Sequence, residues 1–333
     1  MSAVLLRTVG LTRQFRIGGL LSPKTLHAVD EVDLEIGRAE IVALVGESGC
    51  GKSTIARLLA GIYKPTRGEI WFEGRNVTKL RTRRQRLAYA SDVPMLFQDP
   101  FSSLNPAYRV SHAIARGIKL HRRDLPRRER RAEAERVLDA VGLVPAHELI
   151  RKFPHQLSGG QRQRVGFAQA LAFRPKLIIA DEPVSMLDVS IRVGLLNLMT
   201  ELRERQGVSF LYITHDIASA RYVADRVLVM YGGRLVEQGP TEDVLHRPKH
   251  PYTQLLLASV PDPRAPLEVV PDEEAAGEPP RVVDPVPGCR FAPRCPYAVD
   301  VCRAETPLLR DLGPGRLVAC HLAEPDGELR ETA

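Results

Sequence analysis

One stretch of the chain decides the fold: Gly46-Glu47-Ser48-Gly49-Cys50-Gly51-Lys52-Ser53-Thr54. The apolar run Glu40–Val45 precedes it and predicts a strand, and Ile55–Ala60 follows it and predicts a helix. The pattern G-x-x-x-x-G-K-[ST] between a strand and a helix is typical of a loop that binds phosphate groups. Its glycines let successive N–H groups turn inward, and the helix start adds the positive end of its dipole. A chance match of a glycine-rich turn is the alternative, and the two flanking elements argue against it.

The residue types in this loop suit a polyphosphate and its metal ion. We expect Lys52 to reach the β- and γ-phosphates of a nucleotide and the Ser53 hydroxyl to hold Mg²⁺. The nucleotide-binding residues predicted here are Gly46, Ser48, Gly49, Gly51, Lys52, Ser53 and Thr54.

A second group of polar residues follows a continuous apolar run. Leu177–Ala180 reads as a buried parallel strand and ends in Asp181-Glu182. Acidic residues at a strand end are common on their own, but downstream of a phosphate loop they complete a nucleotide hydrolase. We expect Asp181 to hold Mg²⁺, directly or through water, and Glu182 to polarise the attacking water.

A third motif, Leu157-Ser158-Gly159-Gly160-Gln161, lies at the start of a predicted helix. Ser158 can cap that helix, and the glycine N–H groups are open to an anion. One chain already has a phosphate loop. We therefore expect this second anion site, Ser158, Gly159, Gly160 and Gln161, to contact the γ-phosphate of a nucleotide bound to another copy or a paralogue.

The remaining patterns predict an α/β fold. Val4–Arg16 and Ala28–Ile36 alternate as antiparallel strands, and the second is expected to run unbroken with one solvated face. A helical stretch from Asn105 to Gln156 follows the phosphate loop region. The predicted architecture is a parallel core sheet with an antiparallel β subdomain, a helical subdomain and a small Cys-rich tail.

Composition narrows the class of protein. The 333 residues carry a net charge of +7 and contain no apolar run near the ~20 residues of a membrane helix. No signal peptide is recognisable, so a cytoplasmic location is expected. The arginines of Arg122–Arg131 alternate with glutamates and lack interleaved aromatic residues. This pattern favours a salt-bridged helix face over a nucleic-acid-binding surface.

The cysteines point to a metal. Four of the five, Cys289, Cys295, Cys302 and Cys320, fall in the last 45 residues, after a proline-rich stretch. In a cytoplasmic protein such a cluster predicts a metal site before it predicts disulfides, although unliganded cysteines are also open. The spacing suits neither a structural Zn²⁺ site nor a ferredoxin pattern well. Because the tail has little apolar sequence, we expect metal binding to fold it.

Taken together, the motifs resemble those of ATP-binding cassette (ABC) ATPases. Gly46–Thr54 resembles the family's Walker A, Leu157–Gln161 its signature and Leu177–Glu182 its Walker B. By the same resemblance Gln98 is the Q-loop glutamine, Asp188 belongs to the D-loop, and His215 is the switch histidine; Phe15 is the candidate for stacking on adenine. The resemblance implies that two such subunits sandwich two ATP, that His215 contacts the γ-phosphate and that Gln98 touches Mg²⁺ or water.

Further stretches resemble the oligopeptide, dipeptide and nickel importers within that family. They include Gln98–Pro106, His250–Leu256 and Cys289–Pro296. The resemblance implies ATP-driven import of peptides or nickel, two membrane permeases, an extracytoplasmic solute-binding protein and a second ATPase subunit at the cytoplasmic face of the membrane. It also favours a [4Fe–4S] cluster over zinc on the four tail cysteines. A soluble cassette ATPase acting on ribosomes or DNA, or an inactive binding module, is the alternative function.

This interpretation divides the chain into three parts. Residues 1–255 form the nucleotide-binding domain, with the helical subdomain at about 105–165. A proline-rich linker, 256–288, leads to the Cys-rich region, 289–333.

Overall fold

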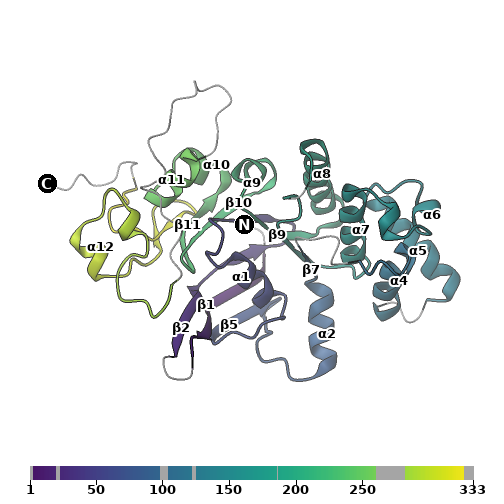
Figure 1. The fold of residues 1–333 in the computed structure, drawn as a ribbon, viewed down its shortest axis with the longest axis horizontal. Helices are drawn as coiled ribbons and strands as arrows, with labels where there is room; N and C mark the ends of the chain where they lie inside the picture. Colours follow the sequence, from purple (N-terminus) through teal and green to yellow (C-terminus); the bar gives the residue numbers. More distant parts are fainter. Residues whose placement is uncertain are drawn as a thin grey trace.

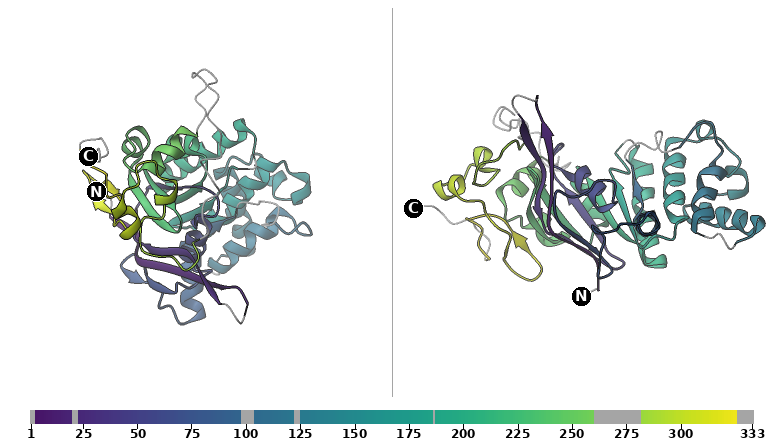
Figure 2. Two further views of the ribbon diagram at one scale, coloured as in Figure 1. Left: turned by 60° about the vertical axis from the view of Figure 1, so that its left-hand side comes forward. Right: turned by 90° about the horizontal axis from the view of Figure 1, so that it is seen from below.

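The computed structural model describes residues 3–19, 23–97, 104–121, 125–185, 187–259 and 282–325. The molecule is elongated, with sheets in the middle (Figures 1 and 2). The helical segment from α4 (Val110–His121) to α7 (Gly159–Leu171) lies at one end, and the C-terminal region around α12 (Asp300–Ala304) lies at the other. In the part of the chain that the structure describes, no helix is both long and apolar enough to cross a membrane.

The larger sheet carries the phosphate loop. Its described strands run in the order β12-β13-β11-β10-β4-β9-β8-β7, and those from β10 to β7 are parallel. Their bounds are β4 Ile41–Val45, β7 Met95–Leu96, β8 Leu177–Asp181, β9 Ser209–Thr214, β10 Arg226–Tyr231, β11 Arg234–Pro240, β12 Arg310–Asp311 and β13 Leu317–Val318. Because β4, β9 and β8 are neighbours and parallel, the segments after their carboxyl ends meet at one edge of the sheet.

The smaller sheet is antiparallel and pairs its strands in the order β2-β1-β5-β6, with β3 also on β1. The strands are β1 Val4–Ile17, β2 Lys24–Val32, β3 Glu35–Gly37, β5 Arg67–Phe72 and β6 Arg75–Asn76. The expectation of one unbroken strand over Ala28–Ile36 is wrong. Glu31 has a φ of 51°, and the Thr8 hydroxyl, which donates to Val32 O (2.8 Å) and accepts from Leu34 N (3.0 Å), fills the break.

Helices cover the sheets and form the helical end. Besides α4, α7 and α12 they are α1 Lys52–Leu59, α2 Arg83–Asp92, α5 Arg127–Ala140, α6 Ala146–Leu149, η1 Pro154–Gln156, α8 Val189–Gln206, α9 Ile217–Val223, α10 Thr241–His246, α11 Pro251–Ala258 and η3 Ala292–Arg294. Helix α5 bears the expected salt-bridged face, since Glu133 pairs with Arg136 (2.5 Å) and Arg174 (3.0 Å) and Glu135 with Arg131 (3.0 Å).

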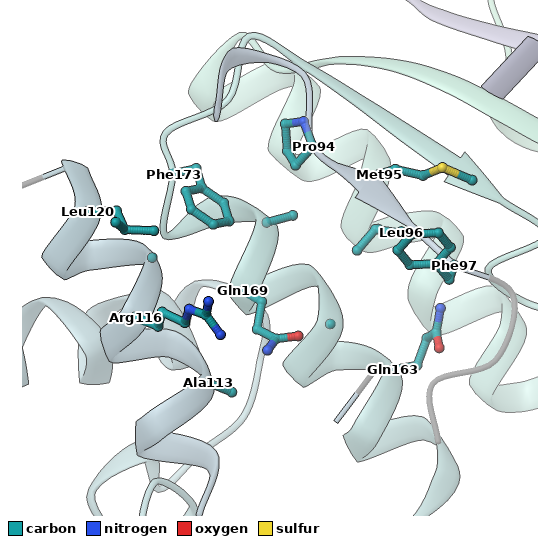
Figure 3. Close-up of a pocket in the computed structure, with 13 residues that line it drawn as sticks. Pro94, Met95, Leu96, Phe97, Ala113, Arg116, Leu120, Gln163, Gln169 and Phe173 are labelled. Carbon is teal, nitrogen blue, oxygen red and sulfur yellow. The ribbon is translucent and has the colours of Figure 1, made fainter. Parts of the chain in front are cut away.

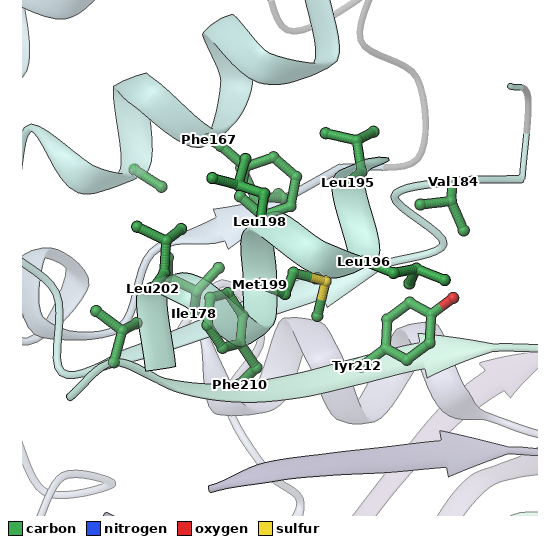
Figure 4. Packing of buried hydrophobic residues seen from close by; sticks show 14 of the residues in the cluster. Phe167, Ile178, Val184, Leu195, Leu196, Leu198, Met199, Leu202, Phe210 and Tyr212 are labelled. Atoms are coloured by element: carbon green, nitrogen blue, oxygen red, sulfur yellow. The ribbon is translucent and has the colours of Figure 1, made fainter. Parts of the chain in front are cut away.

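The parallel strands are buried on both faces. Along β9, alternate residues point to opposite sides of the sheet. Phe210 and Tyr212 pack under apolar side chains of α8, among them Met199 and Leu202 (Figure 4). Leu211 and Ile213 point to the opposite side and belong to the cluster around α1. Burial of a large apolar side chain stabilises the fold by about 1.5–3 kcal/mol, so this sandwich fixes the strand ends that carry the site.

The C-terminal region, residues 282–325, is packed onto the nucleotide domain. Strand β13 pairs with β11, Phe291 is 1% exposed in the main core, and Val283 forms a bridge with Leu26 of β2. The region also has an apolar cluster of its own: Leu312, Val318, Cys320, Leu322 and Ala323. Apolar burial and strand pairing therefore hold the tail, in addition to the metal binding that the sequence predicts.

Candidate nucleotide site

The phosphate loop connects β4 to α1 as predicted, and it requires glycine at two positions. Gly46 has a φ of 152° and Gly51 a φ of 112°. A Cβ at Gly46 would lie 2.2 Å from Met230 O, and one at Gly51 would lie 2.2 Å from Ala28 O. No side chain fits there, so the loop is shaped by neighbours on β10 and β2.

Lys52 and Ser53 open α1 and turn toward the loop and the acidic strand end. The Lys52 side chain is buried, and its Nζ donates to Gly46 O (2.7 Å) and Glu47 O (2.8 Å). The Ser53 hydroxyl donates to Asp181 Oδ1 (3.2 Å). Burial raises the pKa of Asp181, and the bond from Ser53 partly opposes this. A hydroxyl and a carboxylate side by side are oxygen ligands of the kind that Mg²⁺ prefers, so these residues fit that ion.

Glu182 and His215 follow the two neighbouring strands β8 and β9. The His215 Nδ1 lies 3.3 Å from Glu182 Oε1. Glu182 has a φ of 48°, a left-handed conformation that costs energy in a residue with a side chain, and its N–H donates to Ile213 O (2.9 Å). Such strain is typical of functional sites, where the surroundings fix the backbone in place.

These residues surround a cavity of about 700 Å³. The predicted residues on its wall are Phe15, Ser48, Gly49, Gly51, Lys52, Ser53, Thr54, Glu182 and His215. Phe15 lies at the outer end of β1, where the Arg13 guanidinium covers it at 4.6 Å and the Tyr63 ring meets it edge-on at 5.8 Å. Gly46 and Asp181 contact lining residues through the hydrogen bonds above.

The second anion motif lies elsewhere. Ser158 caps α7, as predicted: its hydroxyl accepts from Gln161 N (3.2 Å), and Gln161 Oε1 accepts from Ser158 N (3.1 Å). Gly160 packs against Ile191, and Asp188 is the N-cap residue of α8. None of Ser158, Gly159, Gly160, Gln161 and Asp188 lines the 700 Å³ cavity. Gln98 lies outside the described residues.

The predicted metal ligands of the tail do not form a metal site. Cys302 and Cys320 are buried, Cys289 and Cys295 are half-buried, and all four are free thiols. Burial raises the pKa of Cys289 to about 11 and also raises the pKa values of Cys295 and Cys320. Within the described ranges, no three His, Cys, Asp or Glu side chains are grouped so as to hold a metal ion. The placement of these side chains therefore supports neither the predicted cluster nor zinc.

Several residues around the cavity were not predicted. They are Ile17, Leu26, His27, Ala28, Cys50, Gly232, Gly233 and Val282. Val282 comes from the C-terminal region, and its carbonyl accepts a hydrogen bond from His27 N (2.9 Å). A contact between segments about 250 residues apart leaves no local pattern in the sequence, so motif reading could not find it.

Comparisons with known proteins agree with this geometry. The family model described as "ABC transporter" matches residues 29–185, and the one described as "Oligopeptide/dipeptide transporter, C-terminal region" matches residues 236–302. The probable peptide ABC transporter ATP-binding protein y4tS of Sinorhizobium fredii is 44% identical over 331 residues, covering 98% of this chain and 92% of that protein. The oligopeptide transport ATP-binding protein AppF of Bacillus subtilis is 43% identical over 298 residues, covering 89% and 90%.

A solved structure supports the same assignment. The ATP-binding cassette MJ0796, a dimer in a post-hydrolysis state bound to ADP and Pi, superposes with a TM-score of 0.63 at 28% identity. The match covers 71% of this chain and 99% of that one. The chain therefore belongs to the ABC transporter ATP-binding proteins, in the oligopeptide/dipeptide transporter family, and is an ATP hydrolase.

Proposed function

We propose that this ATPase powers the import of peptides across the cytoplasmic membrane, bound to two permease subunits at the cytoplasmic face. An extracytoplasmic solute-binding protein would deliver the peptide. The observation that carries the proposal is the near full-length similarity to proteins named for peptide and oligopeptide transport. Nickel is the alternative cargo. A cassette ATPase acting on ribosomes or DNA is not favoured, because these relatives are named for transport.

The site residues take the following roles in this proposal. Lys52 and the loop N–H groups bind the β- and γ-phosphates, while Ser53 and Asp181 hold Mg²⁺, which neutralises charge on the phosphates. Glu182 orients and polarises the attacking water, and His215 contacts the γ-phosphate. Phe15 stacks on the adenine, and Gln98 contacts Mg²⁺ or water.

The second anion motif completes the site of a partner ATPase subunit, either a second copy or a paralogue. Ser158–Gln161 lies outside the cavity of its own chain, so its capped helix start is available to another subunit. Asp188 takes part in the same contact between subunits. In this proposal residues 1–255 form the nucleotide-binding domain, 256–288 the linker and 289–333 the Cys-rich region.

A groove beside β7 is the proposed contact with a permease. It has a volume of about 560 Å³ and lies between β7, α4 and α7 (Figure 3). Phe97 and Leu120 on its walls are each 45% exposed, and Arg116 and Gln169 point toward it. Phe97 directly precedes Gln98, so a short apolar helix of a membrane subunit seated here would be joined to the nucleotide site through the chain itself.

Charge placed in this groove is expected to uncouple transport from hydrolysis. In the assembled complex, Leu120→Glu should lower uptake of labelled di- and oligopeptides by about tenfold or more, because a carboxylate in the apolar wall would have to be desolvated when the permease docks. ATP hydrolysis by the isolated chain should stay near the parental rate. The matched control is Val144→Glu, on the same helical end and 70% exposed. Equal loss of uptake and isolated-chain hydrolysis would argue against a coupling surface, and uptake of nickel but not peptides would reassign the cargo.

The tail cysteines also carry a proposal, a [4Fe–4S] cluster formed once their side chains turn toward one another. The backbone N–H of Cys289 donates to Cys302 O (2.7 Å), so two of the four cysteines are held next to each other in the chain fold. Four thiolates are the ligands that such a cluster requires.

Anaerobically purified protein should be brown and contain about four iron per chain, as four thiolate ligands of one cluster imply. Cys302→Ser should abolish the colour, and Cys50→Ser, in the phosphate loop, should not. Colourless protein with about one zinc per chain would replace the cluster with zinc. Protein without either metal would leave four structural thiols.

A further inference from the structure

The C-terminal region touches the phosphate loop directly, through one ion pair. Glu47 follows the first glycine of the loop, and Arg294 lies in η3, 247 residues later. Arg294 Nη1 donates to Glu47 Oε2 (2.9 Å) and Nη2 donates to Oε1 (3.1 Å). The Arg294 side chain is 11% exposed and that of Glu47 is 24% exposed. A bidentate ion pair of this kind fixes the orientation of the two side chains as well as the distance between them.

Aromatic rings hold Arg294 in place. Its guanidinium lies 5.7 Å from the Tyr231 ring and 5.9 Å from the Phe291 ring, and Nη1 also contacts the Tyr231 hydroxyl at 3.3 Å. Tyr252 packs on both rings, and its hydroxyl accepts from Glu47 N (2.9 Å). Glu47 is therefore bound through both its main chain and its side chain by residues that lie outside the loop.

The far end of the loop has a second, indirect link to the same region. Gly233 N donates to Cys50 O (2.9 Å). The neighbouring carbonyl, Gly232 O, accepts a hydrogen bond from Arg290, which is also paired with Asp30. Two arginines four residues apart thus support the two halves of the loop.

The charge of Glu47 makes this contact relevant to nucleotide binding. A carboxylate within a loop that binds a polyanion opposes that binding unless a cation compensates it. The Glu47 carbonyl also accepts from Lys52 Nζ, so a shift of Glu47 moves the group to which the phosphate-binding lysine is anchored. Arg294 is the cation that compensates the carboxylate and fixes its position.

We propose that Arg294 is a positioning residue for the phosphate loop: its ion pair with Glu47 holds the loop in its nucleotide-binding shape and neutralises the carboxylate. The C-terminal region thereby sets the affinity of the ATPase for ATP, although Arg294 does not line the cavity.

The test compares full-length variants by their KM for ATP and by kcat. Arg294→Ala should raise KM by about tenfold with kcat within about twofold, and Arg294→Lys should fall between it and the parent. In the Arg294→Ala background, Glu47→Gln should restore KM to within about threefold of the parent, because it removes the uncompensated charge.

Arg303→Ala is the matched control, since Arg303 pairs with Asp300 on the surface of the same region at 3.5 Å. It should leave both constants unchanged. An unchanged KM in Arg294→Ala overturns the proposal, and so does a KM that Glu47→Gln fails to restore, because a merely structural role predicts additive losses. If Arg294→Ala does not fold, the comparison of Arg294→Lys with Arg294→Lys/Glu47→Gln decides in the same way.

Discussion

Glu182→Gln is expected to reduce ATP hydrolysis by roughly 100-fold or more, since a positioned base contributes about 10²–10⁴-fold to such reactions. The amide keeps the shape of the side chain but cannot accept the proton of the attacking water. Glu182 lies at the wall of the cavity, beside His215 and after Asp181. Binding of ATP should persist, because the phosphate loop and the Ser53–Asp181 pair are untouched. The variant should therefore accumulate as a closed dimer with ATP bound.

The measurement is phosphate release by the assembled transporter, with size-exclusion chromatography in ATP to follow the dimer. Glu201→Gln is the matched control, because Glu201 lies on the outer part of α8 and pairs only with exposed Arg205 among the ion pairs of the described chain. It should behave as the parent. Parental hydrolysis in Glu182→Gln would show that another group activates the water.

Lys52→Ala is expected to act one step earlier and to weaken ATP binding by roughly 100-fold, the effect of removing one partner from a desolvated charge pair. Lys52 is buried, and its ammonium lies where the loop curls around the phosphates. Binding of a fluorescent ATP analogue measures the loss. Lys79→Ala, which removes an exposed partner of Glu69, should bind the analogue normally.

The two variants also differ in assembly. Since the second anion motif of one subunit is proposed to complete the nucleotide site of the other, a subunit that binds no ATP should stay monomeric where Glu182→Gln dimerises. If Lys52→Ala formed the ATP-dependent dimer as well, contacts other than those to the phosphates would drive assembly.

Local sequence was sufficient for the parts of the site that a few consecutive residues build. The phosphate loop, the acidic end of β8 and the Ser158 cap each depend on glycines, strand-forming residues or a capping side chain at fixed spacing. These are short-range requirements, and the structure places each element where they predict it.

Long-range contacts explain the failures. The break after β2 depends on the Thr8 hydroxyl, which lies 24 residues from Val32, its hydrogen-bond partner. Phe291 lies within the tail motif Cys289–Pro296, yet it is buried in the main core. The folded topology determines which residues meet in such contacts, and no periodic pattern in the sequence predicts them.

The pairing of β13 with β11 has a consequence for how the protein is made. A chain emerging from the ribosome folds from its N-terminal end. Until residues 317–318 are synthesised, β11 presents an open sheet edge, and the buried carboxylate of Glu237 lacks its partner Arg316. Val282, which lines the ATP site, and Arg294 also follow the nucleotide-binding motifs in the chain. The nascent ATPase therefore cannot complete its ATP site before residues 282–294 appear, and a chain that stops short of β13 has an open sheet edge that is exposed to aggregation and proteolysis.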